Sequence, residues 1–232
     1  MGHKSYAAII FDLDGTLVED KNIKKHGDEI LRMTLIQFNV KKTRSEDRIG
    51  FWFSGGGFLK LLEKWGIESE SERKSFLQIL SQNEYNIKKR LIESGEVRPY
   101  EDTDILNRLQ GTLKLGLVTN SSNKTVSLQL DRFNLRRYFD SIIALGDFAN
   151  NLRPKPDPDG IIQCLKEMDV ESSKSIVVGD NLTDVIAGKR TNADTALLIR
   201  GKRNPKGMKK ELIHTGIDFK LRSLRELENY IG

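Results

Sequence analysis

The sequence predicts an α/β fold: a parallel sheet with helices on both faces, and an all-helical segment inserted after the first strand. Three observations support this prediction. From residue 99 onward, short apolar runs alternate with stretches of helical periodicity, which is typical of a parallel sheet built with right-handed crossovers. Residues 20–95 show helical periodicity alone. An apolar run at residues 6–10 supplies a buried strand ahead of that segment.

The first strand is followed at once by two acids, Asp12 and Asp14, and by Gly15. The carboxyl end of a strand is the place where open α/β sheets bind ligands. Two carboxylates there need opposite charge close by, and a divalent cation with hard oxygen ligands supplies it. Gly15 permits the sharp turn that takes the chain away from the sheet. The plain alternative is an acidic turn, since Asp and Gly are ordinary turn residues.

The helical segment, residues 20–95, is expected to be an insert between the two parts of a core domain, residues 1–19 and 96–232. Ser69 and Glu72 match a capping box, in which each residue bonds the backbone of the other at a helix start. Apolar residues at helical spacing predict helices near residues 23–38, 58–65 and 70–94.

A run rich in glycine and aromatic residues, Gly50 to Gly57, separates the first two of these helices. We interpret it as a loop that enters the active site, because glycines let the backbone approach a ligand closely. Ser54, which can donate a hydrogen bond, and Gly55 are then candidate substrate-binding residues. The alternative is that the aromatic side chains of residues 51–53 pack inside the helical segment.

The second half of the chain alternates between helices and strands. Helices are expected near residues 102–109, 124–133, 158–168, 183–191 and 224–230. Strands are expected near residues 113–118, 141–145, 175–178, 195–199 and 219–221.

Polar residues follow several of these strands. Thr119 and Asn120 come after the strand at 113–118, and Asp180 comes after the strand at 175–178, with Asp184 one turn further on. The strand at 141–145 leads to a loop in which three prolines stiffen the chain around Lys155. Because the carboxyl ends of parallel strands share one edge, we expect all of these side chains to lie near Asp12 and Asp14.

The expected cluster combines two kinds of site. One is a cation site, and the other is an anion site built from a lysine and uncharged hydrogen-bonding groups. Phosphoryl transfer needs this combination, because a metal ion and a cationic group hold the phosphate oxygens while a nucleophile attacks in line. Singly, each residue also fits an ordinary turn or helix cap. The cation site comprises Asp12, Asp14, Asp180 and Asp184, and the anion site comprises Thr119, Asn120 and Lys155.

Chain length, net charge and cysteine content limit the class of protein to which the chain can belong. The chain has 232 residues, which suits one core with an insert, and it holds no apolar run near the roughly 18 residues of a membrane span. The net charge of +5 comes from scattered basic pairs, so neither nucleic acid nor membrane is an expected partner. One cysteine, Cys164, and the lack of a signal-peptide pattern favour a cytoplasmic protein, expected as a monomer or homodimer.

The string Asp12-Leu13-Asp14-Gly15-Thr16, then Thr119, Lys155 and the string at 179–184, resembles the four motifs of the haloacid dehalogenase (HAD) superfamily. The helical segment resembles the C1 cap of its phosphoglycolate phosphatase and β-phosphoglucomutase group. The resemblance implies a Rossmann-like core and a Mg²⁺-dependent phosphatase. Its substrate would be a small phosphate ester, a phosphorylated metabolite similar to phosphoglycolate.

The resemblance also implies roles for single residues. Asp12 would be the nucleophile that forms an aspartyl-phosphate. Asp14 would protonate the leaving alcohol and later deprotonate the attacking water. Asp12, Asp180 and the carbonyl group of Asp14 would hold Mg²⁺, with Asp184 as a direct or water-mediated ligand. Thr119 and Lys155 would bind the transferring phosphate.

Other activities stay open at this point. Asp14 argues against dehalogenation, because a halide needs no proton to leave. A β-phosphoglucomutase-like phosphoryl transferase is one alternative, and a non-catalytic protein that binds anions or nucleic acid on the same scaffold is another. The basic segment at residues 200–210 either attracts anionic substrates or is a solvated loop.

Overall fold

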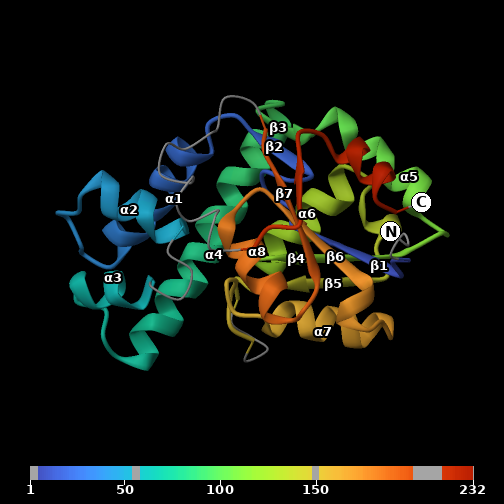
Figure 1. Ribbon diagram of the computed structural model, residues 1–232. Coiled ribbons are helices and arrows are strands. Elements are labelled where there is room, and N and C mark those ends of the chain that lie inside the picture. Colours follow the sequence, from blue (N-terminus) through green and yellow to red (C-terminus); the bar gives the residue numbers. More distant parts are fainter. Residues whose placement is uncertain (1–4, 54–57, 148–151, 201–215, 232) are drawn as a thin grey trace.

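The computed structural model describes residues 5–53, 58–147, 152–200 and 216–231. A six-stranded sheet lies at its centre in the order β5-β4-β1-β6-β7-β8 (Figure 1). Every neighbouring pair in it is parallel, which confirms the predicted α/β fold. The strands are β1 (Ala8–Phe11), β4 (Lys114–Thr119), β5 (Ser141–Ala144), β6 (Ser175–Gly179), β7 (Asp194–Leu198) and β8 (Phe219–Leu221).

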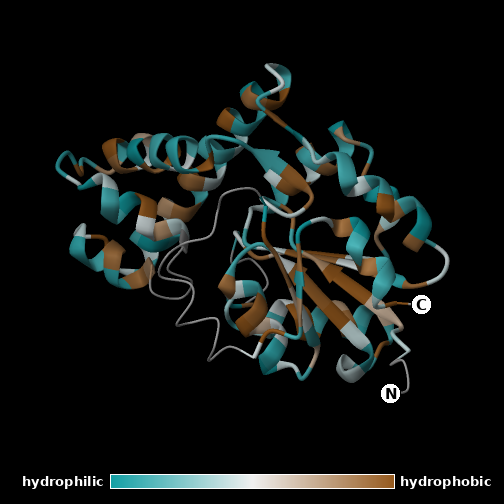
Figure 2. Cartoon of the chain, turned by 45° about the horizontal axis from the view of Figure 1, so that its top comes forward, coloured by the Kyte–Doolittle hydropathy of each residue, from teal (hydrophilic) through white to brown (hydrophobic). Residues whose placement is uncertain are grey.

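Helices cover both faces of the sheet because successive side chains of a strand point to opposite faces. In β1, Ile9 and Phe11 pack with residues of α5, α6 and η5, while Ala8 and Ile10 pack with α7 and α8. The strands are largely apolar, and the polar residues lie on the outer sides of the helices (Figure 2). The helices are α5 (Ile105–Leu109), α6 (Asn123–Arg132), α7 (Asp159–Met168), α8 (Leu182–Arg190) and the 3₁₀ turns η2 (Glu101–Asp104), η3 (Arg136–Tyr138), η4 (Ser172–Lys174) and η5 (Leu224–Asn229).

Four further helices lie to one side of the sheet (Figure 1). The longest, α4, begins at the capping box expected from the sequence, since the Ser69 hydroxyl accepts from the Glu72 backbone N–H and the Glu72 carboxylate accepts from that of Ser69. The four are α1 (Ile23–Gln37), α2 (Ser45–Phe53), α3 (Phe58–Lys64) and α4 (Glu70–Glu93).

The aromatic run differs from its prediction. Residues 50–53 are the last turn of α2 and not a loop. Phe51 is buried, with the rings of Phe58 and Trp65 at centroid distances of 5.6 and 6.1 Å. Trp52 donates from Nε1 to the Gly27 carbonyl group at 2.9 Å. The interpretation of residues 50–53 as an active-site loop is therefore wrong. These residues are helical, and packing the rings of Phe51 and Trp52 against neighbouring helices is more favourable than exposing the rings to water.

The rest of that run, including the candidate substrate-binding residues Ser54 and Gly55, lies outside the described residues. The same holds for residues 201–210, which are all of the basic segment except Arg200. Within the ranges that the structure describes, none of the helices combines the length and apolar composition that crossing a bilayer requires.

A short ribbon joins the helical segment to the sheet, and the sequence did not predict it. Strand β2 (Val18–Asp20) pairs antiparallel with β3 (Val97–Pro99), so the chain leaves for the helices and returns from them side by side. Strands of three residues are too short for a periodic pattern. The ribbon supports our proposal that residues 20–95 form a cap domain and that residues 1–19 and 96–232 form the core.

Candidate active site

Three neighbouring strands bring the predicted residues to one edge of the sheet. β1 lies between β4 and β6, with Phe11 level with Leu117 and Val178. Asp12 follows Phe11 and its backbone N–H still donates to the Val178 carbonyl group at 2.9 Å. Thr119 is the last residue of β4. The carboxyl edge of the sheet therefore carries the acids of the first motif beside the threonine.

Three acids converge at this edge. Asp12, Asp180 and Asp184 each offer a carboxylate oxygen, and these oxygens lie within 4.8 Å of one another. Two glycines make room for them: a Cβ on Gly15 would overlap the carboxylate of Asp180, and a Cβ on Gly179 would overlap that of Asp184. Converging carboxylate oxygens are the donor set that hard divalent cations such as Mg²⁺ prefer, so the residues present fit this ion.

Lys155 lies beside these acids and is 3% exposed. Its Nζ is 2.7 Å from Oδ1 of Asp12 and 2.6 Å from Oδ1 of Asp184, and it donates to the Val118 carbonyl group at 2.8 Å. Burial alone would lower the pKa of this ammonium group, but the two carboxylates outweigh burial and hold the pKa above its ordinary value. The site therefore contains a permanent buried cation at the place where the sequence predicts a phosphate-binding group.

The charge of Asp12 is incompletely balanced. Burial raises the pKa of this carboxyl group above its ordinary value; the ion pair with Lys155 opposes the rise and the negative charge of Asp184 adds to it. Three converging acids thus face one lysine, which leaves an excess of negative charge that a divalent cation would compensate.

In the structure the side chain of Asn120 bonds the backbone of Lys155, and its predicted role in phosphate binding stays a prediction. Its side-chain oxygen accepts from the backbone N–H of Lys155 at 2.9 Å, and its side-chain nitrogen donates to the backbone carbonyl group of Lys155 at 3.1 Å. Asn120 therefore holds the loop that carries the lysine. Thr119, which is 2% exposed, accepts from the Ser121 backbone N–H at 3.2 Å.

Asp14 faces a second set of partners. Lys88 of α4 donates to its Oδ1 at 3.0 Å, and the hydroxyl group of Ser121 donates to its Oδ2 at 2.8 Å. Burial would raise the pKa of Asp14, but Lys88 and the Ser121 hydrogen bond outweigh burial, so the pKa lies below its ordinary value. The side chain of Asp14 is not among the three converging acids.

The contribution of α4 to the site was not predicted from the sequence. Lys88 is 5% exposed and also contacts Asp20 at 3.4 Å, and Glu84 accepts from the hydroxyl group of Ser122 at 3.0 Å. Burial raises the pKa of Glu84 to about 7, and nearby Asp14 adds to the rise. One signal was present: Glu84 and Lys88 share the helical phase of the apolar face of α4, where a buried polar residue is unusual. The buried residues of α4 are Phe76, Leu80, Asn83, Glu84, Ile87, Lys88 and Leu91.

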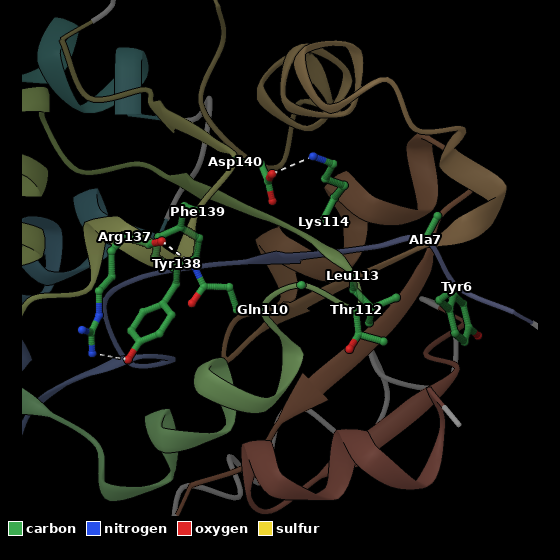
Figure 3. Close-up of a pocket in the computed structure, with 11 residues that line it drawn as sticks. Tyr6, Ala7, Gln110, Thr112, Leu113, Lys114, Arg137, Tyr138, Phe139 and Asp140 are labelled. Carbon is green, nitrogen blue, oxygen red and sulfur yellow. Dashed lines mark hydrogen bonds and ion pairs between the residues drawn. The ribbon is translucent and has the colours of Figure 1, made fainter.

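A hollow of about 640 Å³ lies at the opposite, amino edge of the sheet (Figure 3). It is lined by residues 6–7, 110–114 and 137–140. Its charged side chains are already paired, since Lys114 contacts Asp140 at 2.9 Å and Arg137 donates to the hydroxyl group of Tyr138 at 2.8 Å. The converging acids at the carboxyl edge are therefore the better candidate for chemistry.

Comparison with known proteins places the chain among hydrolases. A model of the haloacid dehalogenase-like hydrolase family matches residues 9–198. A phosphoglycolate phosphatase of Aquifex aeolicus is 30% identical over 198 residues, which are 83% of this chain and 84% of that protein. Pyrophosphatase PpaX of Bacillus velezensis is 29% identical over 199 residues, 84% of each. The crystal structure of a predicted phosphoglycolate phosphatase from Haemophilus somnus has the same fold, with a TM-score of 0.70 at 18% identity over 98% of this chain and 99% of that one.

Proposed function

The chain belongs to the haloacid dehalogenase-like hydrolase family, and we propose that it is a Mg²⁺-dependent phosphatase that acts through an aspartyl-phosphate on Asp12. That it is a phosphatase follows from the family and from its named relatives. The observation that carries the finer proposal is the meeting of Asp12 with Lys155 and two further acids at the end of β1. A nucleophile, a fixed cation and a cation-binding acid group then stand together, as phosphoryl transfer requires.

In the first step, a carboxylate oxygen of Asp12 attacks phosphorus and the bond from phosphorus to the leaving oxygen breaks. Lys155 and Thr119 hold the phosphoryl oxygens, and the buried ammonium group of Lys155 stabilises the charge that builds up on them. The leaving oxygen is protonated through Asp14, which takes up a proton from solvent when the negative charge of the bound phosphate ester lies beside it. In the second step, Asp14 takes a proton from water, which attacks the aspartyl-phosphate and releases inorganic phosphate.

Mg²⁺ would be held by Asp12, Asp180 and the carbonyl group of Asp14, and when bound it would neutralise charge on the phosphate oxygens. Both carboxylate oxygens of Asp184 already have protein partners: Oδ1 contacts Lys155, and Oδ2 accepts from the backbone N–H of Asn181 at 3.1 Å. This supports a role for Asp184 that is mediated by water. The match of three carboxylates to a hard cation supports the choice of Mg²⁺.

The substrate that we propose is a small phosphorylated metabolite similar to phosphoglycolate. Two relatives are named for phosphoglycolate and for pyrophosphate, and in both compounds the leaving group is small. A cytoplasmic location, expected from the single cysteine, belongs to the same proposal.

The test is phosphate release from a panel of small phosphate esters and pyrophosphate, with and without Mg²⁺. The wild type is compared with Asp12→Asn, which keeps the shape of the side chain and removes the nucleophile. We expect release that depends on Mg²⁺ and is absent in the variant. Release that persists in folded Asp12→Asn, or no release from any compound by the wild type, would refute the proposal.

A further inference from the structure

The loop that carries Lys155 lies on the surface of the protein. Among residues 152–158, only Lys155 is buried, and the others are half-buried or exposed. Its side chain reaches inward to Asp12 and Asp184. Since no apolar side chain among residues 152–158 is fully buried, polar contacts with neighbouring elements largely decide where the backbone of this loop lies.

One of these contacts comes from Arg190, the last residue of α8. Its Nη1 donates to the backbone carbonyl group of Pro156, the residue after Lys155, at 2.9 Å. The same nitrogen lies 3.7 Å from Oδ1 of Asp157. Asn120 bonds the two backbone groups of Lys155 itself. Arg190 therefore holds the chain one residue beyond the point at which Asn120 holds it.

Helix α8 is firmly placed and also carries one of the three converging acids. Asp184 lies in its first turn, with Oδ1 2.6 Å from Nζ of Lys155. The helix packs directly on β6 and β7, since a Cβ on Gly188 would lie 2.7 Å from the side chain of Thr195 and 3.0 Å from that of Val177. One helix therefore holds the lysine at two places: its first turn contacts the ammonium group, and its last residue contacts the loop backbone.

We propose that Arg190 is a positioning residue for Lys155: by clamping the loop to α8, it keeps the ammonium group aimed at the phosphoryl oxygens. This inference rests on the proposed function, in which Lys155 binds the transferring phosphate. Arg190 acts through the lysine and takes no part in bond making.

A role in stability alone fits Arg190 less well. Its side chain is 51% exposed, and solvent screens its ion pair with Asp157, so this pair contributes little to the free energy of unfolding. A small displacement of a binding group is costly for catalysis even where the fold is unaffected. The contact with Pro156 is therefore expected to matter more for the rate than for stability.

The test replaces Arg190 by methionine, which keeps an unbranched side chain and removes every donor. For Arg190→Met we expect kcat/KM on the best phosphate ester of the panel to fall about 5- to 20-fold. Inorganic phosphate, measured by calorimetry, should bind about 3- to 10-fold more weakly, because the displaced lysine no longer meets its oxygens. The thermal unfolding temperature should change little, whereas a purely structural role would move this temperature and leave phosphate binding unchanged.

Arg132→Met is the matched control. Arg132 is exposed and likewise lies in the last turn of its helix, α6, so both substitutions remove a cation from a helix C-terminus, where cations are favourable. This variant should match the wild type in kcat/KM and in phosphate binding.

Two further measurements separate positioning from a simple attraction of anions by the charge of Arg190. In a Lys155→Met background, Arg190→Met should not weaken phosphate binding further, because no lysine is left to position. The loss of kcat/KM should also persist between about 0.05 and 0.5 M KCl, whereas long-range attraction is screened over this range. If Lys155→Met does not fold, as judged by circular dichroism, the comparison at two salt concentrations decides.

The outcomes separate the two proposals. The positioning role is overturned, while the wild type remains an active phosphatase, by an unchanged kcat/KM in Arg190→Met, by an equal loss in Arg132→Met, or by a loss that disappears at high salt. Weaker phosphate binding that remains in the Lys155→Met background overturns it as well. A wild type that releases no phosphate from any ester overturns the proposed function instead. A loss that persists at high salt and is specific to Arg190 supports the clamp on the lysine loop.

Discussion

Asn120 bonds both backbone polar groups of Lys155, accepting from its N–H at 2.9 Å and donating to its carbonyl group at 3.1 Å. The side-chain amide thus makes with one residue of the loop at 152–158 the two hydrogen bonds that a neighbouring strand would otherwise make. The ammonium group at the other end of Lys155 reaches Asp12 and Asp184. The position of Lys155 is therefore set at its backbone by Asn120 and at its ammonium group by the two acids.

Asn120→Ala should weaken the enzyme more than it weakens the fold. The loop loses two hydrogen bonds, which is expected to cost about 1–2 kcal/mol of unfolding free energy, because the loop is near the surface. Lys155 then moves relative to the phosphate, and we expect kcat/KM to fall about 10-fold or more, since small misplacements of a binding group are costly. Steady-state kinetics and urea denaturation check both values. Asn229→Ala, at an exposed asparagine in η5, is the control, and equal activity of the two variants would contradict the prediction.

Gly179→Ala should disturb the cation site and leave the sheet intact. A Cβ at this position would overlap the carboxylate of Asp184, which must then move away from the other two acids. We expect a higher Mg²⁺ concentration at half-maximal activity, measured by titrating the metal at saturating substrate. Gly50→Ala is a matched control, because a Cβ on Gly50 in α2 meets nothing within 4 Å. An unchanged Mg²⁺ requirement in Gly179→Ala would argue against the assigned site.

Glu84→Gln should make stability less dependent on pH. In the folded protein, burial raises the pKa of Glu84 from 4.5 to about 7, with Asp14 adding to the rise and Lys88 opposing it. The folded state thus favours the protonated form: the carboxyl group contributes fully below the unfolded pKa, and this contribution is lost as the pH rises through about 7. We therefore expect the variant to resemble the wild type at low pH and to be more stable than it at pH above about 8.

Thermal or urea unfolding at several pH values tests this expectation. Glu93→Gln, at an exposed carboxyl group near the end of the same helix, should follow the wild type throughout. If Glu84→Gln is less stable than the wild type at high pH, the carboxylate is stabilised by its contacts with Ser122 and the predicted sign is wrong.

Arg200→Ala should destabilise the core. The guanidinium group donates to Asp102 at 2.9 and 3.1 Å and to the Thr16 carbonyl group at 2.7 Å, and its side chain is 14% exposed. Removing it leaves the buried carboxylate of Asp102 without its charge partner, which is expected to cost about 3–5 kcal/mol. Guanidinium chloride denaturation measures the loss. Arg225→Ala breaks the exposed pair with Asp104 and should lower the free energy of unfolding much less, because solvent screens that pair; equal losses in the two variants would contradict the prediction.

Arg200 also shows what a pattern of charges in the sequence does not predict. In the sequence it begins a basic segment that is interpreted as either a substrate-attracting or a solvated loop. In the structure Arg200 is paired inside the protein and lies over the ring of Tyr100 at 3.5 Å. A run of like charges does not tell which of its members has a buried partner, because that partner, Asp102, is far away in sequence.

The sequence by itself determined the parallel sheet and the gathering of Asp12, Thr119, Lys155 and Asp180 at one edge of it. Apolar runs and helical periods are local signals, and the rules of parallel sheets then place every strand end on the same edge. Only the tertiary structure decided that Asn120 holds Lys155 and that Lys88 reaches Asp14. The same holds for Phe51, which is buried between helices. These contacts depend on how α4 and the loops pack against the sheet, and packing between distant segments leaves no regular period in the sequence.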